Sequence, residues 1–355
     1  MAKKVSEADL FPMEVHHEAF VREGRMVAMP LGFPGATTAI DANDSRITAL
    51  ALRRDDRYET VYGGTSGRRA HVFYGWLRGV TGVVVDLGGD GVSTEVAGVA
   101  SLKRRVVAAV NGPKGGRLLA RVHPPISYDC IQEWTMNVDP LQPVAEFPGE
   151  RMREIHAGAD AGSVVGCTTG GPFVWDGEAG RVIRVPGPVL AMARHPAGGL
   201  VGVDSQGEIG LVREGRGGLR IRRTGKAPGR WTAPVWSGLG GPGLFLADDA
   251  GTIFEVTGTG RPRRAGKAPL APVTCMAATA DGRLFGFCGR EISHLFVLEA
   301  GGAARELGVA MSVLNRRRYG YEFSCAVCDR DGHILFGERD RGGHLWVLFP
   351  AIRPA

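Results

Sequence analysis

Two segments near the carboxyl end of the sequence repeat one pattern at a distance of about fifty residues. Residues 280–286 (ADGRLFG) and 293–297 (SHLFV) correspond to residues 330–337 (RDGHILFG) and 343–347 (GHLWV). Both copies predict a turn, a short apolar strand, a loop with glycine and a second strand that begins with histidine. A period of this size, with several short strands in each unit, is typical of a β-propeller.

Short apolar runs separated by Gly, Pro, Asp and Ser continue this pattern through most of the chain. The sequence therefore predicts an all-β fold, a seven-bladed β-propeller that takes up residues 1–355 as one domain. Its blades are expected to start near residues 47, 97, 153, 190, 232, 273 and 323. The last blade offers only three strands before the chain stops, whereas residues 25–32 (RMVAMPLG) read as a spare strand. We expect this amino-terminal strand to join the last blade and to close the ring, which would leave no exposed edge.

Composition argues against several other classes of protein. No apolar stretch is long enough to span a membrane, and residues 1–9 (MAKKVSEAD) turn polar with no apolar run after them, which predicts a cytoplasmic protein without a signal peptide. The net charge is +6, yet no basic run exceeds three residues, so nucleic acid is not an expected partner. The six cysteines predict neither a disulfide framework nor a zinc site, and we expect no metal, no cofactor and a monomer.

The loops of the seventh blade carry the densest group of chemically active side chains. Loops between the second and third strands of a blade share one rim with the loops that join blades, so two segments are expected to meet. The first supplies Arg316, Arg317, Arg318, Tyr319 and Tyr321, and the second supplies Glu338, Arg339, Asp340 and Arg341. Arginine pairs with carboxylates and tyrosine can exchange protons, so the cluster predicts a site for an anionic ligand. A rim of mutually neutralising, solvated charges is the alternative.

Histidines recur at the start of corresponding strands in the first, sixth and seventh blades. These are His71, His294 and His344. They are candidates for proton transfer, although a repeat copies structural residues as well, and a histidine there could simply form a hydrogen bond to the neighbouring blade. They lie too far apart to share one metal ion.

Two further candidates lie elsewhere. His156 falls on an innermost strand and is expected to line the central channel. Trp134 lies in an irregular insertion of the second blade, from about residue 123 to 140, where it would form the wall of a cleft or only anchor the loop.

Residues 62–73 (YGGTSGRRAHVF) and 336–346 (FGERDRGGHLW) resemble repeats of bacterial seven-bladed propellers, some of which are polysaccharide lyases that cleave rhamnose–glucuronate, ulvan or oligogalacturonate linkages. The resemblance implies cleavage beside a uronic acid in a small or oligosaccharide substrate. Arginine would neutralise the carboxylate, and histidine or tyrosine would exchange protons. The clustered histidines and glutamine of an oligogalacturonate lyase metal site are not found here.

Three hypotheses follow from the sequence. The first is a carbon–oxygen lyase that acts on an anionic, uronate-containing or otherwise carboxylated small substrate. The second is a propeller that binds a protein partner without catalysis, and the third is a propeller enzyme of another reaction class. A deep pocket lined by Arg, His and Tyr would favour an enzyme, whereas an apolar, aromatic-poor rim would favour a binding protein.

Overall fold

The computed structural model describes residues 22–31, 40–53, 60–78, 81–123, 140–158, 162–215, 218–238, 243–313 and 318–352. Nearly all of the regular structure in these residues is β-strand. The strands are β1 (Gly24–Pro30), β2 (Arg46–Arg53), β3 (Thr60–Ser66), β4 (Val72–Arg78), β5 (Thr81–Asp86), β6 (Glu95–Ser101), β7 (Arg105–Gly112), β8 (Gly115–Val122), β9 (Gln142–Pro148), β10 (Met152–Ala157), β11 (Ser163–Thr168), β12 (Gly171–Asp176), β13 (Arg181–Arg184), β14 (Ala191–Arg194), β15 (Leu200–Val203), β16 (Glu208–Gly215), β17 (Gly218–Lys226), β18 (Val235–Gly238), β19 (Leu244–Ala247), β20 (Thr252–Val256), β21 (Pro262–Lys267), β22 (Val273–Ala278), β23 (Leu284–Cys288), β24 (His294–Leu298), β25 (Arg305–Met311), β26 (Tyr319–Gly320), β27 (Phe323–Cys328), β28 (Ile334–Glu338) and β29 (His344–Pro350).

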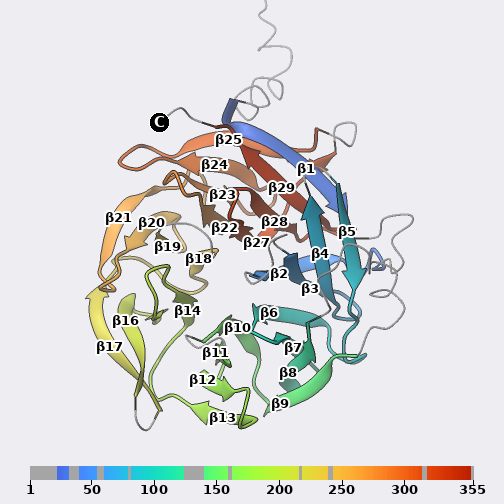
Figure 1. Ribbon diagram of the computed structural model, residues 1–355. Coiled ribbons are helices and arrows are strands. Elements are labelled where there is room, and N and C mark those ends of the chain that lie inside the picture. Colours follow the sequence, from blue (N-terminus) through green and yellow to red (C-terminus); the bar gives the residue numbers. More distant parts are fainter. Residues whose placement is uncertain are drawn as a thin grey trace, which may run out of the picture.

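Neighbouring strands pair antiparallel in sets of four, each set forming one blade. The sets are β2–β5, β6–β9, β10–β13, β14–β17, β18–β21, β22–β25, and β27–β29 with β1. Figure 1 shows these blades arranged around a centre, with the first strand of each set innermost. The chain is therefore an all-β propeller. No helix in the described residues is long and apolar enough to cross a membrane.

The repeated Asp-Gly pairs form the turns that the sequence predicts. Gly282 and Gly332 both have a φ of 84°, a backbone conformation that glycine adopts at little cost. The amide of Gly282 donates to the carbonyl of Thr279, and the amide of Gly332 donates to the carbonyl of Asp329. Each turn connects the innermost strand of its blade to the next strand, β22 to β23 in one case and β27 to β28 in the other.

The first described strand lies at the outer edge of the last blade. β1 pairs antiparallel with β29, with Met26 opposite Leu348 and Pro30 opposite His344. This is the position that the sequence predicts for residues 25–32. Met26 is fully buried, so β1 contributes side chains to the core as well as backbone hydrogen bonds.

The core lies between the faces of neighbouring blades. Phe287 of β23 stacks on Phe323 of β27 with ring centroids 3.8 Å apart, and Phe336 of β28 meets Phe287 edge to face at 4.9 Å. Phe147 and Phe173 make a similar contact between the second and third blades at 4.6 Å. Such aromatic pairs add to the free energy gained by burying apolar area, so each seam between blades is held by its own cluster.

Candidate functional site

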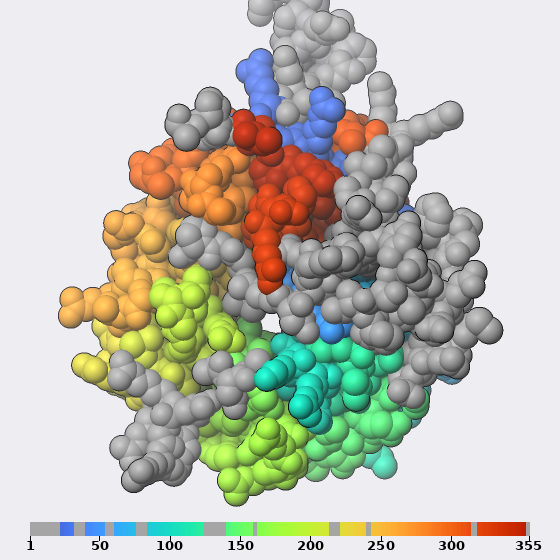
Figure 2. Space-filling view, in the orientation of Figure 1, coloured from blue at the N-terminus to red at the C-terminus, as the bar shows by residue number. Residues whose placement is uncertain are grey.

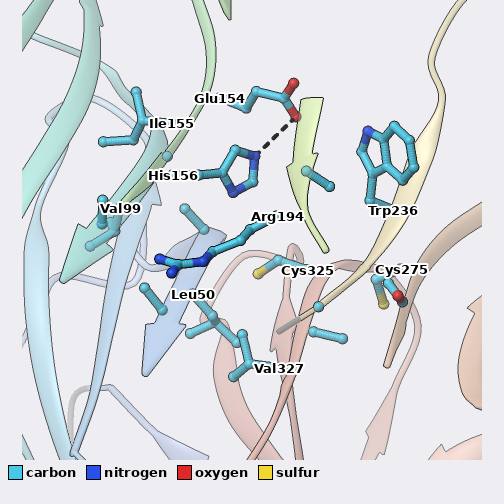
Figure 3. A pocket seen from close by; sticks show the side chains of 18 of the residues that line it. Leu50, Val99, Glu154, Ile155, His156, Arg194, Trp236, Cys275, Cys325 and Val327 are labelled. Carbon is cyan, nitrogen blue, oxygen red and sulfur yellow. Dashed lines mark ion pairs between the residues drawn. The ribbon is translucent and has the colours of Figure 1, made fainter. Parts of the chain in front are cut away.

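Two connected cavities lie at the centre of the ring. The central channel has a volume of about 570 Å³, and residues on or directly beside every innermost strand line it. A second cavity, also about 570 Å³, forms the mouth of this channel. It lies on the face where the innermost strands begin, which we call the mouth face. Figure 2 shows the molecule hollowed near its centre, and Figure 3 shows side chains that line the channel.

A β-bulge occurs at a corresponding position in five innermost strands. The pairing register shifts between Ile47 and Ala49, Val96 and Gly98, Met152 and Glu154, Val273 and Cys275, and Phe323 and Cys325. The extra residues are Thr48, Ala97, Arg153, Thr274 and Ser324, which we call the bulge ring. All of them line the channel. Bulges redirect side chains and are common beside active sites, so the bulge ring sets the chemistry of this opening.

Three bulge-ring side chains bond the blade that follows. The hydroxyl of Ser324 donates to the carbonyl of Ile47 at 2.5 Å, and that of Thr48 donates to the carbonyl of Val96 at 2.6 Å. Arg153 reaches the carbonyl of Leu190 from its Nη1 at 3.2 Å. These bonds fix the mouth by joining innermost segments of neighbouring blades.

Arg153 is the exception in the bulge ring, since the other members are small. Its side chain is exposed at the mouth, and among the described residues it has no carboxylate partner. Arg339, from the loop between β28 and β29, lines the same mouth and has no carboxylate partner within the described ranges either. By contrast, Arg151 pairs with Glu95 at 2.6 Å. The mouth therefore holds two guanidinium groups without a carboxylate partner in this part of the chain, and Glu154 also lines it.

A third arginine, Arg194 of β14, extends into the channel itself (Figure 3). Its Nη1 donates to the carbonyls of Ala157 and Gly158, at 3.4 and 3.0 Å. No carboxylate in the described part of the molecule pairs with it. One carboxylate lines the channel among these residues, that of Glu154, and it accepts a hydrogen bond from the amide of Met192. The channel and its mouth thus carry an excess of positive charge.

His156 lines the channel, as the sequence predicts. Its Nε2 donates to the carbonyl of Met192 at 2.7 Å and lies 3.8 Å from the carboxylate of Glu154. Since Nε2 holds the donated proton, Nδ1 of the neutral ring is an acceptor. In Figure 3 this second nitrogen lies on the side of Arg194.

Within the predicted cluster of the seventh blade, Glu338 pairs with both Arg318 and His344. Glu338 is fully buried and accepts two hydrogen bonds from Nη2 of Arg318, at 3.1 and 3.0 Å. The amide of His344 donates to it at 2.8 Å, and the ring nitrogen Nδ1 lies 3.0 Å away. Burial alone would raise the pKa of Glu338, but His344 and Arg318 together hold it below its usual value. These three side chains form a buried ionic set.

The rest of that cluster lies on the mouth face. The carboxylate of Asp340 accepts from the amide of Tyr321 at 3.3 Å, and burial and the nearby Glu338 raise its pKa. Tyr319 is half-buried in β26, whereas Arg341 is exposed. Among the predicted site residues that the structure describes, Arg339 and His156 are the ones that line the mouth or the channel. Arg316, Arg317 and Trp134 lie outside the described residues.

The other two repeated histidines are also paired with carboxylates of their own blades. His71 places Nδ1 2.9 Å from Asp86, and this hydrogen bond raises the pKa of the imidazole despite its partial burial. His294 contacts Glu306 on the neighbouring strand β25. Each ring therefore holds two strands of its own blade together, whereas the structural alternative from the sequence placed its partner in the neighbouring blade.

Two cysteines line the channel as well, Cys275 of β22 and Cys325 of β27. Burial raises the pKa of the Cys325 thiol to about 12 and raises that of Cys275 well above its ordinary value. Both are therefore neutral thiols near pH 7, without the nucleophilicity of a thiolate. Among the residues described, no group of three or more His, Cys, Asp and Glu side chains is placed to hold a metal ion.

Comparison with known proteins bears on the fold. No protein family matches the sequence, and no curated protein matches it either. The WD40 β-propeller domain of Doa1 is similar over 88% of this chain and 94% of its own, with a TM-score of 0.58 and 12% sequence identity. YCF48, solved with a D1 peptide, is similar over 94% and 97%, with a TM-score of 0.56 and 14% identity. A fungal alcohol oxidase of the AA5 family, solved with copper, is similar over 93% and 76%, with a TM-score of 0.58 and 10% identity. At these identities the likeness shows the propeller fold alone.

Proposed function

We propose that this protein binds an anionic ligand at the mouth of its central channel. The observation that carries the proposal is the pair Arg153 and Arg339, two guanidinium groups at one cavity that have no carboxylate partner in the described residues. A guanidinium group presents two parallel donors to a carboxylate or phosphate. The ligand would supply the negative charge that the mouth lacks.

The backbone supports the same assignment. The position of Arg153 in the bulge ring carries Thr, Ala, Thr and Ser in the other four strands. Small residues are enough to join blades at this position, as Thr48 and Ser324 show. A long charged side chain there costs conformational entropy when it is ordered, so its presence favours a role beyond joining blades.

The proposal is tested with citrate and inorganic phosphate as probes, each at constant ionic strength against chloride. A ligand that binds only the folded state raises the melting temperature, and the stabilisation grows with the logarithm of one plus the ratio of ligand concentration to dissociation constant. We expect at least one probe to raise it in the wild-type protein, and Arg153→Gln and Arg339→Gln to remove the effect. Equal responses in wild type and both variants would place anion binding elsewhere.

Lyase chemistry on a uronate is the second candidate function, and His156 is the observation that favours it. This side chain combines an acceptor nitrogen with a position in a channel that also holds Arg194. In such a reaction Arg194 would pair with the uronate carboxylate, and Nδ1 of His156 would take the C5 proton. A double bond then forms between C4 and C5 as the C4–O bond breaks, and the departing oxygen takes up a proton.

Oligogalacturonide is the probe for this second candidate. The elimination product absorbs ultraviolet light, so absorbance during incubation measures the reaction directly. We expect His156→Ala to abolish any activity while the fold remains intact. If no product forms with the wild-type protein, the lyase hypothesis is wrong for this substrate, and anion binding at the mouth still stands.

A further inference from the structure

Three exposed apolar side chains lie together on the mouth face. They are Leu270, in the loop before β22; Ile292, in the loop between β23 and β24; and Tyr321, just before β27, with exposed fractions of 38%, 48% and 45%. We call them the apolar patch. Single exposed apolar side chains are ordinary, but a contiguous group on one face marks an interaction surface.

Contacts between the loops that carry the patch place its three residues near one another. A methyl group at Gly289 would lie 3.5 Å from the Leu270 side chain and 2.6 Å from the carbonyl of Ile292, and the amide of Gly289 donates to the carbonyl of Pro272. The amide of Ser293, next to Ile292, donates to the carbonyl of Tyr321 at 2.6 Å. The three loops that carry the patch are therefore bonded to one another.

The same contacts lead from the patch to the mouth of the channel. The amide of Arg339 donates to the carbonyl of Glu322 at 2.8 Å, which places Arg339 directly beside Tyr321 along the rim. Arg339 in turn lines the mouth with Arg153. The loops of the sixth and seventh blades thus carry the apolar patch up to Arg339, and the mouth continues this surface to Arg153 of the third blade.

We propose that this surface docks an extended acidic peptide segment of a partner protein. This inference rests on the proposed function: a carboxylate of the peptide occupies the mouth at Arg153 and Arg339, and an aromatic or aliphatic side chain covers the apolar patch. Charge complementarity between the two arginines at the mouth and a peptide carboxylate favours an acidic partner. The exposed charges beside the patch, Arg290, Glu291 and Glu322, have both signs, whereas Arg153 and Arg339 at the mouth have no carboxylate partner among the described residues.

The chemistry of the patch suits such a partner. Tyrosine and arginine are enriched among the residues that contribute most to protein interfaces, because both combine a large contact area with polar groups. An apolar peptide side chain that buries the patch gains about 25 cal/mol for each Å² removed from water. The carboxylate fixes the orientation of the peptide, and the patch adds affinity that a free anion lacks.

The test uses synthetic peptides in which one aspartate and one phenylalanine are separated by glycine spacers of increasing length, with free citrate as the reference probe. The control peptides replace aspartate by asparagine or phenylalanine by serine. We expect one spacer length to bind the wild-type protein about tenfold or more tightly than the serine control. Ile292→Ser and Tyr321→Ser should remove this gain and leave citrate binding unchanged.

The matched control is Val122→Ser, since Val122 is exposed at 66% and ends β8 on the opposite face. If every spacer length binds no better than the serine control, or if Ile292→Ser and Tyr321→Ser bind as the wild type does, the docking surface is wrong while the anion site stands. If neither citrate nor any peptide binds the wild-type protein, the docking surface and the anion site both fail.

Discussion

The hydroxyl of Thr48 donates a hydrogen bond of 2.6 Å to the carbonyl of Val96, and so joins the innermost strand of one blade to that of the next. Ser324 makes the corresponding bond to Ile47 across the neighbouring seam. Both residues owe their orientation to a β-bulge. The rigidity of the mouth therefore depends on side chains that a regular strand would direct elsewhere.

Loss of the Thr48 hydroxyl should weaken this seam. We expect Thr48→Val to lower the free energy of unfolding by about 1 kcal/mol, the usual value of one such bond. Urea unfolding measures the change. Thr259→Val, in an exposed turn, should alter stability by less than about 0.5 kcal/mol. An equal effect of the two substitutions would show that the Thr48 bond does not stabilise the seam.

The buried ionic set of the seventh blade should be more sensitive. Arg318→Gln leaves the carboxylate of Glu338 buried without its guanidinium partner, and we expect a loss of about 2 kcal/mol near pH 7. This expected loss of stability is smaller than that for a fully buried pair because Arg318 is about one-third exposed. Arg263→Gln, which removes an exposed pair with Glu255, should cost little.

The pH dependence of this loss follows from the lowered pKa of Glu338. A carboxyl group with a lowered folded-state pKa contributes stability above its unfolded-state pKa, and loses that contribution as the pH falls through the folded value. The difference between wild type and Arg318→Gln should therefore shrink on acidification. A difference that stays constant or grows below the ordinary glutamate pKa of about 4.3 would contradict the assignment.

His71 should show the opposite trend. The hydrogen bond to Asp86 raises its folded-state pKa, so its contribution is fully present below the ordinary histidine pKa of about 6.5 and is lost as the pH rises through the folded value. Unfolding of wild type and His71→Gln, measured between about pH 6 and pH 9, should give a stability difference that decreases with pH. A difference that increases with pH would refute this role.

The place of β1 gives a further prediction. Removal of residues 1–31 would leave β29 as an unpaired edge and expose the core where Met26 and Val27 are buried. We expect a lower melting temperature and concentration-dependent association in size-exclusion chromatography. Removal of residues 1–21 alone is the control, because it keeps β1. Equal stability of the two shortened chains would mean that β1 does not support the ring.

The sequence predicts the fold well and the candidate site only in part. Asp-Gly turns, such as Asp281-Gly282, and short apolar runs are local signals, so the propeller and its strands can be inferred without the structure. The position of β1 can also be predicted, because the carboxyl-terminal part of the sequence supplies only three of the four strands of the last blade. Gly64 lies inside strand β3, although a glycine beside short polar residues favours a loop.

The mouth depends on features that a sequence does not display. The bulge at Arg153 arises from the pairing of β10 with β11. The residues next to Arg153 in the sequence therefore do not distinguish it from an ordinary surface arginine. His156 and Arg339 can be predicted because one lies in an innermost strand and the other in a rim loop. The pairings of His71, His294 and Arg318 with carboxylates are set by the packing of strands that lie up to twenty residues apart.

The most direct test of the central claim is the dissociation constant of the best-bound anion, measured by calorimetry for wild type, Arg153→Gln and Arg223→Gln. Arg223 is an exposed arginine on the outer strand β17 and serves as the matched control. A charge-assisted contact contributes about 1.5–3 kcal/mol, so Arg153→Gln should weaken binding roughly ten- to a hundredfold while Arg223→Gln leaves it unchanged. Identical constants for all three folded proteins would show that the mouth of the channel is not the anion site.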